Sequence, residues 1–348
     1  SFEIENFMFD TPQRGFLPRK LRHLWTQLDP DGGVPLFRLS YNKDDSLGLH
    51  AVVEVKDVAM TLPPLGARMT NTSGRFTIVG DTIFIHDLRG QVAGIPYTVN
   101  GQIDGFHLKK SSFNLLVETE FSEIAKPSDY VALLPSRIRV QLDRFKLYGQ
   151  FQIRAVLKRK APEKSIQYQG AITFRDGQLM YEDFPYPLRH IAGMVHFTDD
   201  KIEIDPVAGL QARGLGDARF IIKGGITSDK GDTVTHLKIN AHDIKFDQTL
   251  INALPEQFQT AINICGNKAQ RLGLIDMGLL PNDEGGPMFE LGGTTDLFIE
   301  IERSIGIKKN IRNSIDIDMQ GMGILFEFWP YPIRTTKGKV RVRPGRIY

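Results

Sequence analysis

The chain has 348 residues, and its 43 Lys or Arg against 41 Asp or Glu leave a formal net charge of only +2. A chain with so little net charge lacks the positive electrostatic potential that drives nucleic-acid binding, and nucleic acid is not an expected partner. A single cysteine, Cys265, cannot form an internal disulfide or a cysteine-rich zinc site. The sequence contains no run of the roughly 18 to 20 apolar residues that a membrane-spanning helix requires.

The first predicted element after the N-terminal region is a short helix that begins at Leu17-Pro18. Proline suits the first turn of a helix. The apolar positions then follow a helical spacing of three and four, at Leu21, Leu24, Trp25 and Leu28. Pro30 and the glycines after it predict the end of the helix.

Short strands follow the helix almost without interruption. They alternate apolar and polar residues and are separated by Gly, Asp, Asn or Pro turns. The first set is predicted at 34–39, 49–55, 74–78, 82–85, 97–103 and 113–120, and the second at 151–157, 168–174, 193–197, 201–204, 218–222 and 233–239. With no long helices between them, these strands predict a mainly β fold built from antiparallel meanders.

The order of these elements repeats along the chain. The Leu-Pro helix start recurs about every 120 residues, and a strand block recurs after about 120 and again after about 145 residues. The matching positions are Leu17, Leu134 and Leu254; Asp57, Gly74 and Asp81 with Asp176, Gly193 and Asp200; and 184–188 with 329–333. We therefore predict three units, at 1–110, 111–236 and 237–348. In the second copy, 137–148 fits either a helix or a strand.

No residue pattern predicts catalysis, a cofactor or a metal. His236 and His242 share one face of a predicted strand, but no third ligand stands at a useful spacing. Asp199-Asp200 falls where Gly80-Asp81 makes a hairpin turn in the preceding unit, which favours a turn over a pair of catalytic carboxylates. Gly214-Leu215-Gly216 lacks the third glycine and the following helix of a phosphate loop. We expect a protein that is not an enzyme.

The alternating strands give the sheet one apolar and one polar face, and an apolar face must be covered. Each unit could close into its own sandwich or barrel core. Alternatively, the sheet could stay open and curved, so that the apolar faces form a trough for an apolar ligand. The candidate lining residues, for each of which core packing is the alternative, are Val53, Val55, Phe76, Ile78, Ile83, Ile85, Ile172, Phe174, Val195, Phe197, Ile202, Ile204, Ile317, Met319, Val340 and Val342.

A family resemblance favours the trough. The strand block alternates apolar residues after Gly74 or Gly193 and continues through an Asp turn to two isoleucines. In later copies an aromatic-Pro-Tyr-Pro-apolar segment precedes it. This pattern, together with the junction from Leu237 through Asp247 to Leu254-Pro255, resembles the repeats of the AsmA-like superfamily, in particular its TamB- and YhdP-like members. The resemblance covers nearly the whole chain, although the family's membrane anchor and C-terminal domain have no counterpart here.

The resemblance implies an elongated, twisted, U-shaped groove made by an antiparallel β-sheet of tandem repeats with short helices. It also implies a segment of a longer protein, located in the bacterial periplasm and anchored to the inner membrane through a part absent from this chain. The last repeat stops at Ile347-Tyr348, inside a predicted strand, which agrees with a segment.

The implied partner is a phospholipid or another acyl-chain lipid that travels between the inner and outer membranes during outer-membrane biogenesis. Envelope membrane proteins are further possible partners. A structural or adhesive surface array of β-repeats with self-packed cores is the alternative of a different class. A carbohydrate-active β-domain ranks below both, because the sequence offers only Trp25 and Trp329 as large aromatic platforms and no paired carboxylates.

Overall fold

The computed structural model describes residues 2–8, 19–41, 49–63, 67–108, 110–124, 146–161, 164–182, 184–229, 232–245, 248–254, 294–305, 310–321, 323–326, 329–334, 337–344 and 346–347. Within these ranges, 19 strands belong to one antiparallel sheet and 2 form a separate hairpin. The expected mainly β fold, one large antiparallel sheet with short helices, is confirmed. The helix starts predicted at Leu17 and Leu134, most of 137–148, and Cys265 lie outside the described residues.

The chain divides into two compact units. The first comprises 1–139, 150–173 and 196–199, and the second comprises 140–149, 174–195 and 200–348. This division concerns packing, whereas the three units at 1–110, 111–236 and 237–348 concern sequence repeats and stay a prediction. The two packing units are described in turn.

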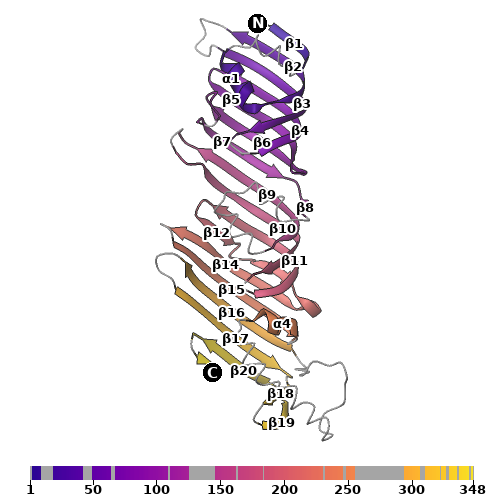
Figure 1. Cartoon of the computed structure of the whole chain (residues 1–348), viewed down its shortest axis with the longest axis vertical. Helices are drawn as coiled ribbons and strands as arrows, with labels where there is room; N and C mark the ends of the chain where they lie inside the picture. The colour runs from indigo at the N-terminus through magenta and orange to yellow at the C-terminus, as the bar shows by residue number, and fades with distance from the viewer. Residues whose placement is uncertain are drawn as a thin grey trace. The chain divides into compact units, whose positions relative to one another are not determined.

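The first unit is a meander in which consecutive strands pair antiparallel (Figure 1). After β7 the pairing passes to β9, and from β9 to β10. Strands β10 and β11 contribute residues to both units. The elements are β1 (Phe2–Met8), α1 (Arg19–Leu28), β2 (Asp31–Tyr41), β3 (Leu49–Leu62), β4 (Ala67–Val79), β5 (Thr82–Val92), β6 (Ile95–Asp104), β7 (Ser112–Thr119), β8 (Ser122–Ile124), β9 (Tyr148–Arg159), β10 (Gln167–Tyr181) and β11 (Phe184–Thr198).

The second unit continues with the same antiparallel pairing. Strands β12 and β13 both pair with β14, which is followed in order by β15, β16, β17, β20 and β21, while β18 and β19 form the separate hairpin. The elements are β12 (Lys201–Ile204), β13 (Leu210–Arg213), η2 (Leu215–Asp217), β14 (Arg219–Asp229), β15 (Asp232–Lys245), α4 (Gln248–Ala253), β16 (Thr294–Ile305), β17 (Asn310–Gln320), β18 (Gly323–Phe326), β19 (Trp329–Arg334), β20 (Lys337–Arg343) and β21 (Arg346–Ile347).

Asp81 and Asp200, which the repeat places at matching turns, occupy equivalent strand connections in the structure. The carbonyl oxygen of Asp81, between β4 and β5, accepts a hydrogen bond from Gly105 N at 2.7 Å. The carbonyl oxygen of Asp200, between β11 and β12, accepts one from Ser228 N at 2.6 Å. Both aspartates therefore occupy strand connections that are tied to the next hairpin, as the turn interpretation of Asp199-Asp200 requires.

Several strands are longer than the sequence predicts, because they bend where a turn was expected. Strand β3 was predicted to end at Val55 but continues to Leu62, past a register shift between Val55 and Val58. Asp57 adopts a left-handed backbone conformation there, with φ of 54°. A residue in that conformation inside a strand is typical of a β-bulge, which bends the strand and increases its twist.

A glycine on the neighbouring strand accompanies such a bend. Gly74 of β4 has φ of 156°, and a Cβ atom at this position would lie 2.8 Å from the carbonyl oxygen of Asp87 in β5. Asp87 is itself left-handed, with φ of 45°, next to a register shift between Ile85 and Leu88. The two backbones therefore approach each other too closely for any side chain at Gly74.

The strand register places apolar side chains in rows across one face of each unit. In the first unit a row runs across β3 to β7, and in the second unit another runs across β13 to β17 and β20, omitting the separate hairpin. Their members stand opposite one another in successive pairs: Ala51, Ile78, Ile83, Ile103 and Phe113, and then Leu210, Ile222, Ile239, Ile299, Ile315 and Val342. We call this side of the sheet the apolar face.

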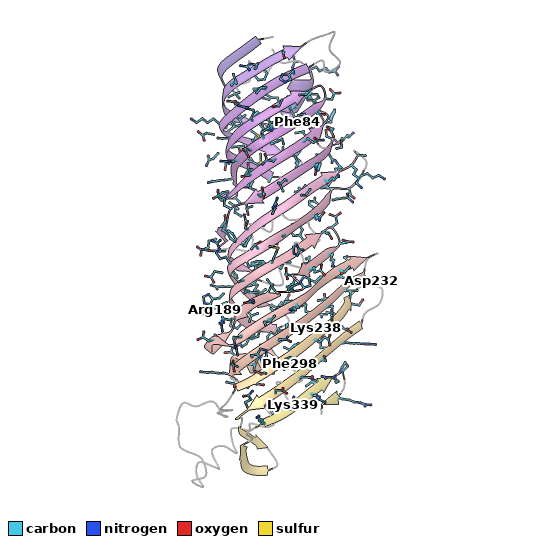
Figure 2. The ribbon with its side chains drawn as sticks, turned by 180° about the vertical axis from the view of Figure 1, so that it is seen from behind. Phe84, Arg189, Asp232, Lys238, Phe298 and Lys339 are labelled. Carbon is cyan, nitrogen blue, oxygen red and sulfur yellow. The ribbon has the colours of Figure 1, made fainter. Side chains whose placement is uncertain are left out.

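The opposite side, which we call the outer face, carries exposed ion pairs between neighbouring strands. Examples are Arg154 with Glu118 at 3.1 Å in the first unit and Lys339 with Asp318 at 3.1 Å in the second. Figure 2 shows the sheet from behind with its side chains, including Lys238 and Lys339. Exposed pairs of this kind contribute at most about 1 kcal/mol each, so the fold depends mainly on burial of the apolar face.

Substitution of a bend glycine tests this account of the curvature. Gly101 of β6 has φ of 139°, and a Cβ there would collide with the carbonyl oxygen of Asn114. We expect Gly101→Ala to lower the free energy of unfolding by about 3 kcal/mol, because backbone strain and collision add. Gly94→Ala is the control, since its φ is 82° but no atom lies within 4 Å of its Cβ, and we expect about 1 kcal/mol. Urea unfolding followed by circular dichroism measures both, and equal losses would contradict the bend account.

Candidate apolar site under helix α1

Helix α1 lies against the apolar face of the first unit (Figure 1). It ends at Leu28, and Asp29 then adopts a left-handed conformation with φ of 43°. Leu24, Trp25 and Leu28 point to one side of the helix because they are spaced by three and four residues. These side chains and Pro30 form the helix side of an apolar cavity.

The sheet forms the opposite side of this cavity, which has a volume of about 80 Å³ and is lined only by apolar residues. Predicted lining residues that meet there are Val53, Val55, Phe76, Ile78, Ile83 and Ile85. Phe37, Met60, Leu62, Ile103 and Leu108 complete the lining. Most of the sheet residues are almost fully buried; Ile85, for example, is only 2% exposed.

Polar contacts hold α1 over the cavity. The side-chain amide of Gln27 donates a hydrogen bond from Nε2 to the carbonyl oxygen of Phe106 at 2.6 Å. One turn earlier, His23 Nε2 lies 2.9 Å from His107 Nδ1, so the two imidazoles share a hydrogen bond. Both partners belong to the connection between β6 and β7, which therefore forms a side wall of the site.

A buried arginine braces that connection from the sheet. Arg159, at the end of β9, donates from Nε to the carbonyl oxygen of Ser111 at 2.6 Å and from Nη2 to that of Leu108 at 2.9 Å. Its guanidinium lies 4.8 Å from the centre of the Phe113 ring. Burial lowers the pKa of Arg159. Because the pKa of an arginine side chain in water is very high, the guanidinium nevertheless stays charged. Leu108 is thereby fixed in the cavity wall.

The remaining predicted lining residues also lie on the apolar face but do not line this cavity. They alternate along β10, β11, β12, β17 and β20. Those that are buried are Ile172, Phe174, Phe197, Ile204 and Val342, and those that are half-buried are Val195, Ile202, Ile317, Met319 and Val340. Their burial agrees with an apolar face in each unit, and their lining of a lipid path stays a prediction.

The cavity includes residues that the sequence interpretation left out. Leu24, Trp25 and Leu28 were assigned to an apolar helix side without a partner for that side. The partner could have been expected, because a helix with one apolar side must bury it against another element. Met60 and Leu62 were missed because β3 was expected to end before its bulge.

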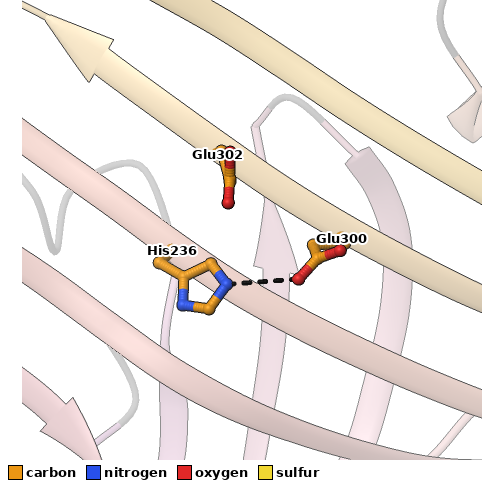
Figure 3. A group of neighbouring side chains, drawn as sticks. All are labelled: His236, Glu300 and Glu302. Carbon is orange, nitrogen blue, oxygen red and sulfur yellow. Dashed lines mark hydrogen bonds and ion pairs between the residues drawn. The ribbon is translucent and has the colours of Figure 1, made fainter. Parts of the chain in front are cut away.

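A second group of polar side chains gathers on the outer face of the second unit (Figure 3). His236 Nε2 lies 3.3 Å from Glu300 Oε1, and the possible ligand atoms of His236, Glu300 and Glu302 all lie within 4.8 Å of one another. Spacing along the sequence gave no third ligand, because both glutamates come from the neighbouring strand β16.

Lys238 Nζ lies 3.1 Å from Glu300 Oε1. Hydrogen bonds from Lys238 and His236 lower the pKa of Glu300. Glu300 therefore belongs to an ion-pair network with Lys238 and His236, and we assign no metal to the cluster.

No protein-family model, curated protein or solved structure matches this chain. Within the described ranges, no helix has the length and apolar character needed to cross a membrane. The basis for a functional proposal is therefore the geometry of the apolar face and its cover.

Truncation of a cavity residue tests whether the apolar face is closed in the absence of ligand. We expect Ile85→Ala to lower the free energy of unfolding by about 3 kcal/mol, because a buried side chain is lost and the space does not refill completely. The matched control is Val156→Ala on the outer face, where the side chain is 38% exposed, and we expect a change within about 0.5 kcal/mol. Urea unfolding measures both. A cost at Ile85 as small as that at Val156 would show that water already reaches this part of the face.

Proposed function

We propose that this chain is a non-enzymatic segment that shields the acyl chains of lipids along the apolar face of its sheet. The observation that carries the proposal is the cavity between α1 and the sheet, because every residue that lines it is apolar. Rows of apolar side chains in register on both units support it further. The lining positions tolerate different apolar side chains between repeats, such as Phe76 and Val195, as a surface that only needs to be apolar allows.

Such a face lowers the main barrier to moving a lipid through water. Exposing an acyl chain of about 16 carbons costs on the order of 12 kcal/mol, at about 0.8 kcal/mol per methylene. Contact with a continuous apolar surface removes a large part of this cost. No nucleophile, acid or metal is needed for that task.

Helix α1 has to move outward before an acyl chain can lie on this part of the face. The cavity of about 80 Å³ is smaller than the roughly 150 Å³ apolar cavities that admit a single benzene ring. The polar contacts that hold the helix join it to the connection between β6 and β7, through Gln27 and His23. In the proposed mechanism, α1 covers the face when no lipid is present and lies over the acyl chain when one is bound.

The resemblance to AsmA-like repeats supports a location in the bacterial periplasm, with attachment to the inner membrane through a segment outside this chain. The transported molecule would then be a phospholipid or another acyl-chain lipid that passes between the inner and outer membranes. Envelope membrane proteins would deliver or receive it.

A structural or adhesive array of β-repeats is the second candidate. The observation that favours it is the low exposure of the apolar rows, for example 0% at Ala51 and 1% at Ile103. Such a protein would keep α1 on the sheet permanently and bind no lipid.

Fluorescence from Trp25 separates the two candidates. The chain has 2 tryptophans, so Trp329→Phe leaves Trp25 as the only one. We expect a fatty acid with brominated carbons to quench Trp25 emission in a saturable manner, because the acyl chain would replace sheet side chains next to the indole. The same fatty acid without bromine is the control and should not quench. Absence of quenching at saturating fatty acid would favour the self-packed array.

A pair of charge substitutions on one strand tests which face carries the lipid. Met319 lies on the apolar face of β17 and is half-buried, whereas its neighbour Gln320 is exposed on the outer face. We expect Met319→Glu to slow transfer of a fluorescent phospholipid between vesicles by about tenfold or more, because an unpaired carboxylate facing hydrocarbon costs several kcal/mol. Gln320→Glu adds the same charge and should leave transfer unchanged. Equal effects of the two variants, with both folded by circular dichroism, would exclude the apolar face as the lipid path.

A further inference from the structure

A polar hollow of about 740 Å³ opens beside α1 in the first unit. Its lining comes from the N-terminal part of the helix, from the turn between β4 and β5, and from the connection between β6 and β7. The lining residues are Arg19, Arg22, His23, Thr26, Asp81, Gly105, Phe106 and His107. Arg19 and Arg22 are exposed and face solvent from the helix.

The hollow lies next to the apolar cavity, because neighbouring residues of the same segments line the two spaces, although no residue lines both. On the helix, His23 lines the hollow while Leu24 lines the cavity. On the connection between β6 and β7, His107 lines the hollow while Leu108 lines the cavity. The turn before β5 likewise places Asp81 in the hollow, two residues before the cavity residue Ile83. A molecule with a polar end and an apolar end could therefore reach both spaces.

The charged groups of the hollow favour an anion. Two guanidinium groups, of Arg19 and Arg22, and one carboxylate, that of Asp81, are among the groups that line the hollow. The imidazoles of His23 and His107 add ring nitrogens that are already hydrogen-bonded to each other at 2.9 Å. Arginine presents several N–H donors in a planar arrangement that matches phosphate and carboxylate oxygens, which makes it the preferred side chain for such groups.

We propose that this hollow binds the anionic head group, phosphate or carboxylate, of an amphiphile whose acyl chain enters beneath α1. The inference rests on the proposed function and specifies its substrate class. Because Arg19 and Arg22 belong to α1 itself, a head group bound to them stays with the helix when the helix moves outward. The same contact would therefore select the ligand and keep the helix over the acyl chain.

Amphiphiles with one common tail test the head-group preference. Dodecyl phosphate, dodecanoate and dodecyl glucoside are titrated into the whole chain below their micelle-forming concentrations, and the Kd of each is measured by calorimetry. We expect the anionic amphiphiles to bind about tenfold more tightly than the glucoside, because charge-assisted hydrogen bonds in an open hollow add moderately to affinity. Whichever of the two anions binds more tightly identifies the head group. The preference should weaken as salt is added.

Substitution of the arginines locates the preference. We expect the double variant Arg19→Gln with Arg22→Gln to bind the anionic amphiphiles no more tightly than the glucoside, and to bind the glucoside as the unaltered chain does. The matched control removes two charges from the outer face, by Arg75→Gln with Arg154→Gln, where these arginines pair with Glu54 and Glu118. This control should keep the full preference for anions.

The possible failures are distinguishable. If none of the three amphiphiles binds the unaltered chain, the proposed function is wrong, and the head-group site falls with it. If all three bind equally, the apolar site stands and the head-group inference is overturned. It is also overturned if the arginine variant, folded by circular dichroism, loses affinity for the glucoside as much as for the anions, since the arginines would then support the shape of the site.

Discussion

Burial of one apolar sheet face is the constraint on which the rest of this structure depends. Alternation along the described strands of the large sheet produces that face, and each Å² of its apolar surface left in water costs about 25 cal/mol. In the first unit, bulges and glycines bend the strands, and α1 is laid on the face with Leu24, Trp25 and Leu28 toward it. Buried Arg159 also helps to cover the face, because it fixes the connection between β6 and β7 that closes the side of the site.

The outer face serves a different purpose. Its ion pairs are exposed and add little stability, but they occupy positions that must stay in water. A slip of one residue in the register would carry Glu300 and Lys238 to the apolar side and move Ile299 and Leu237 to solvent. The polar face thus helps to specify the register that the apolar face stabilises. His236, Lys238 and Glu300 belong to this polar face and share an ion-pair network there.

The sequence predicted the features that depend on local periodicity. Alternation identified the strands and their two faces, spacing of three and four identified α1, and short turns identified an antiparallel meander. Features that depend on close approach of distant backbones were not predictable in this way. The strand predicted at 49–55 instead continues through a bulge at Asp57, and a Cβ atom on Gly32 of β2 would lie only 3.1 Å from the carbonyl oxygen of Asp57.

The candidate site was predicted only in part for the same reason. Val53, Phe76 and Ile85 could be placed on one face from alternation alone. The seating of α1 on that face depends on Gln27 and His23 meeting a connection about 80 residues further along the chain, and no local pattern encodes such a meeting. The polar hollow beside α1 forms at the same contact. Neither Arg22 nor His107 belongs to a local pattern that would predict it.

In the proposed function, α1 can act as a removable cover, because an entering acyl chain replaces apolar contacts with other apolar contacts. A helix of 10 residues is marginal by itself in water, so α1 takes most of its stability from its apolar contact with the sheet. An acyl chain that enters beneath it offers apolar surface to both the helix and the sheet, and each lost contact is replaced by a similar one. The net change in free energy is therefore small compared with the cost of exposing either partner to water. A surface that hides lipid without holding it tightly allows the lipid to leave, which a protein that passes lipids onward requires.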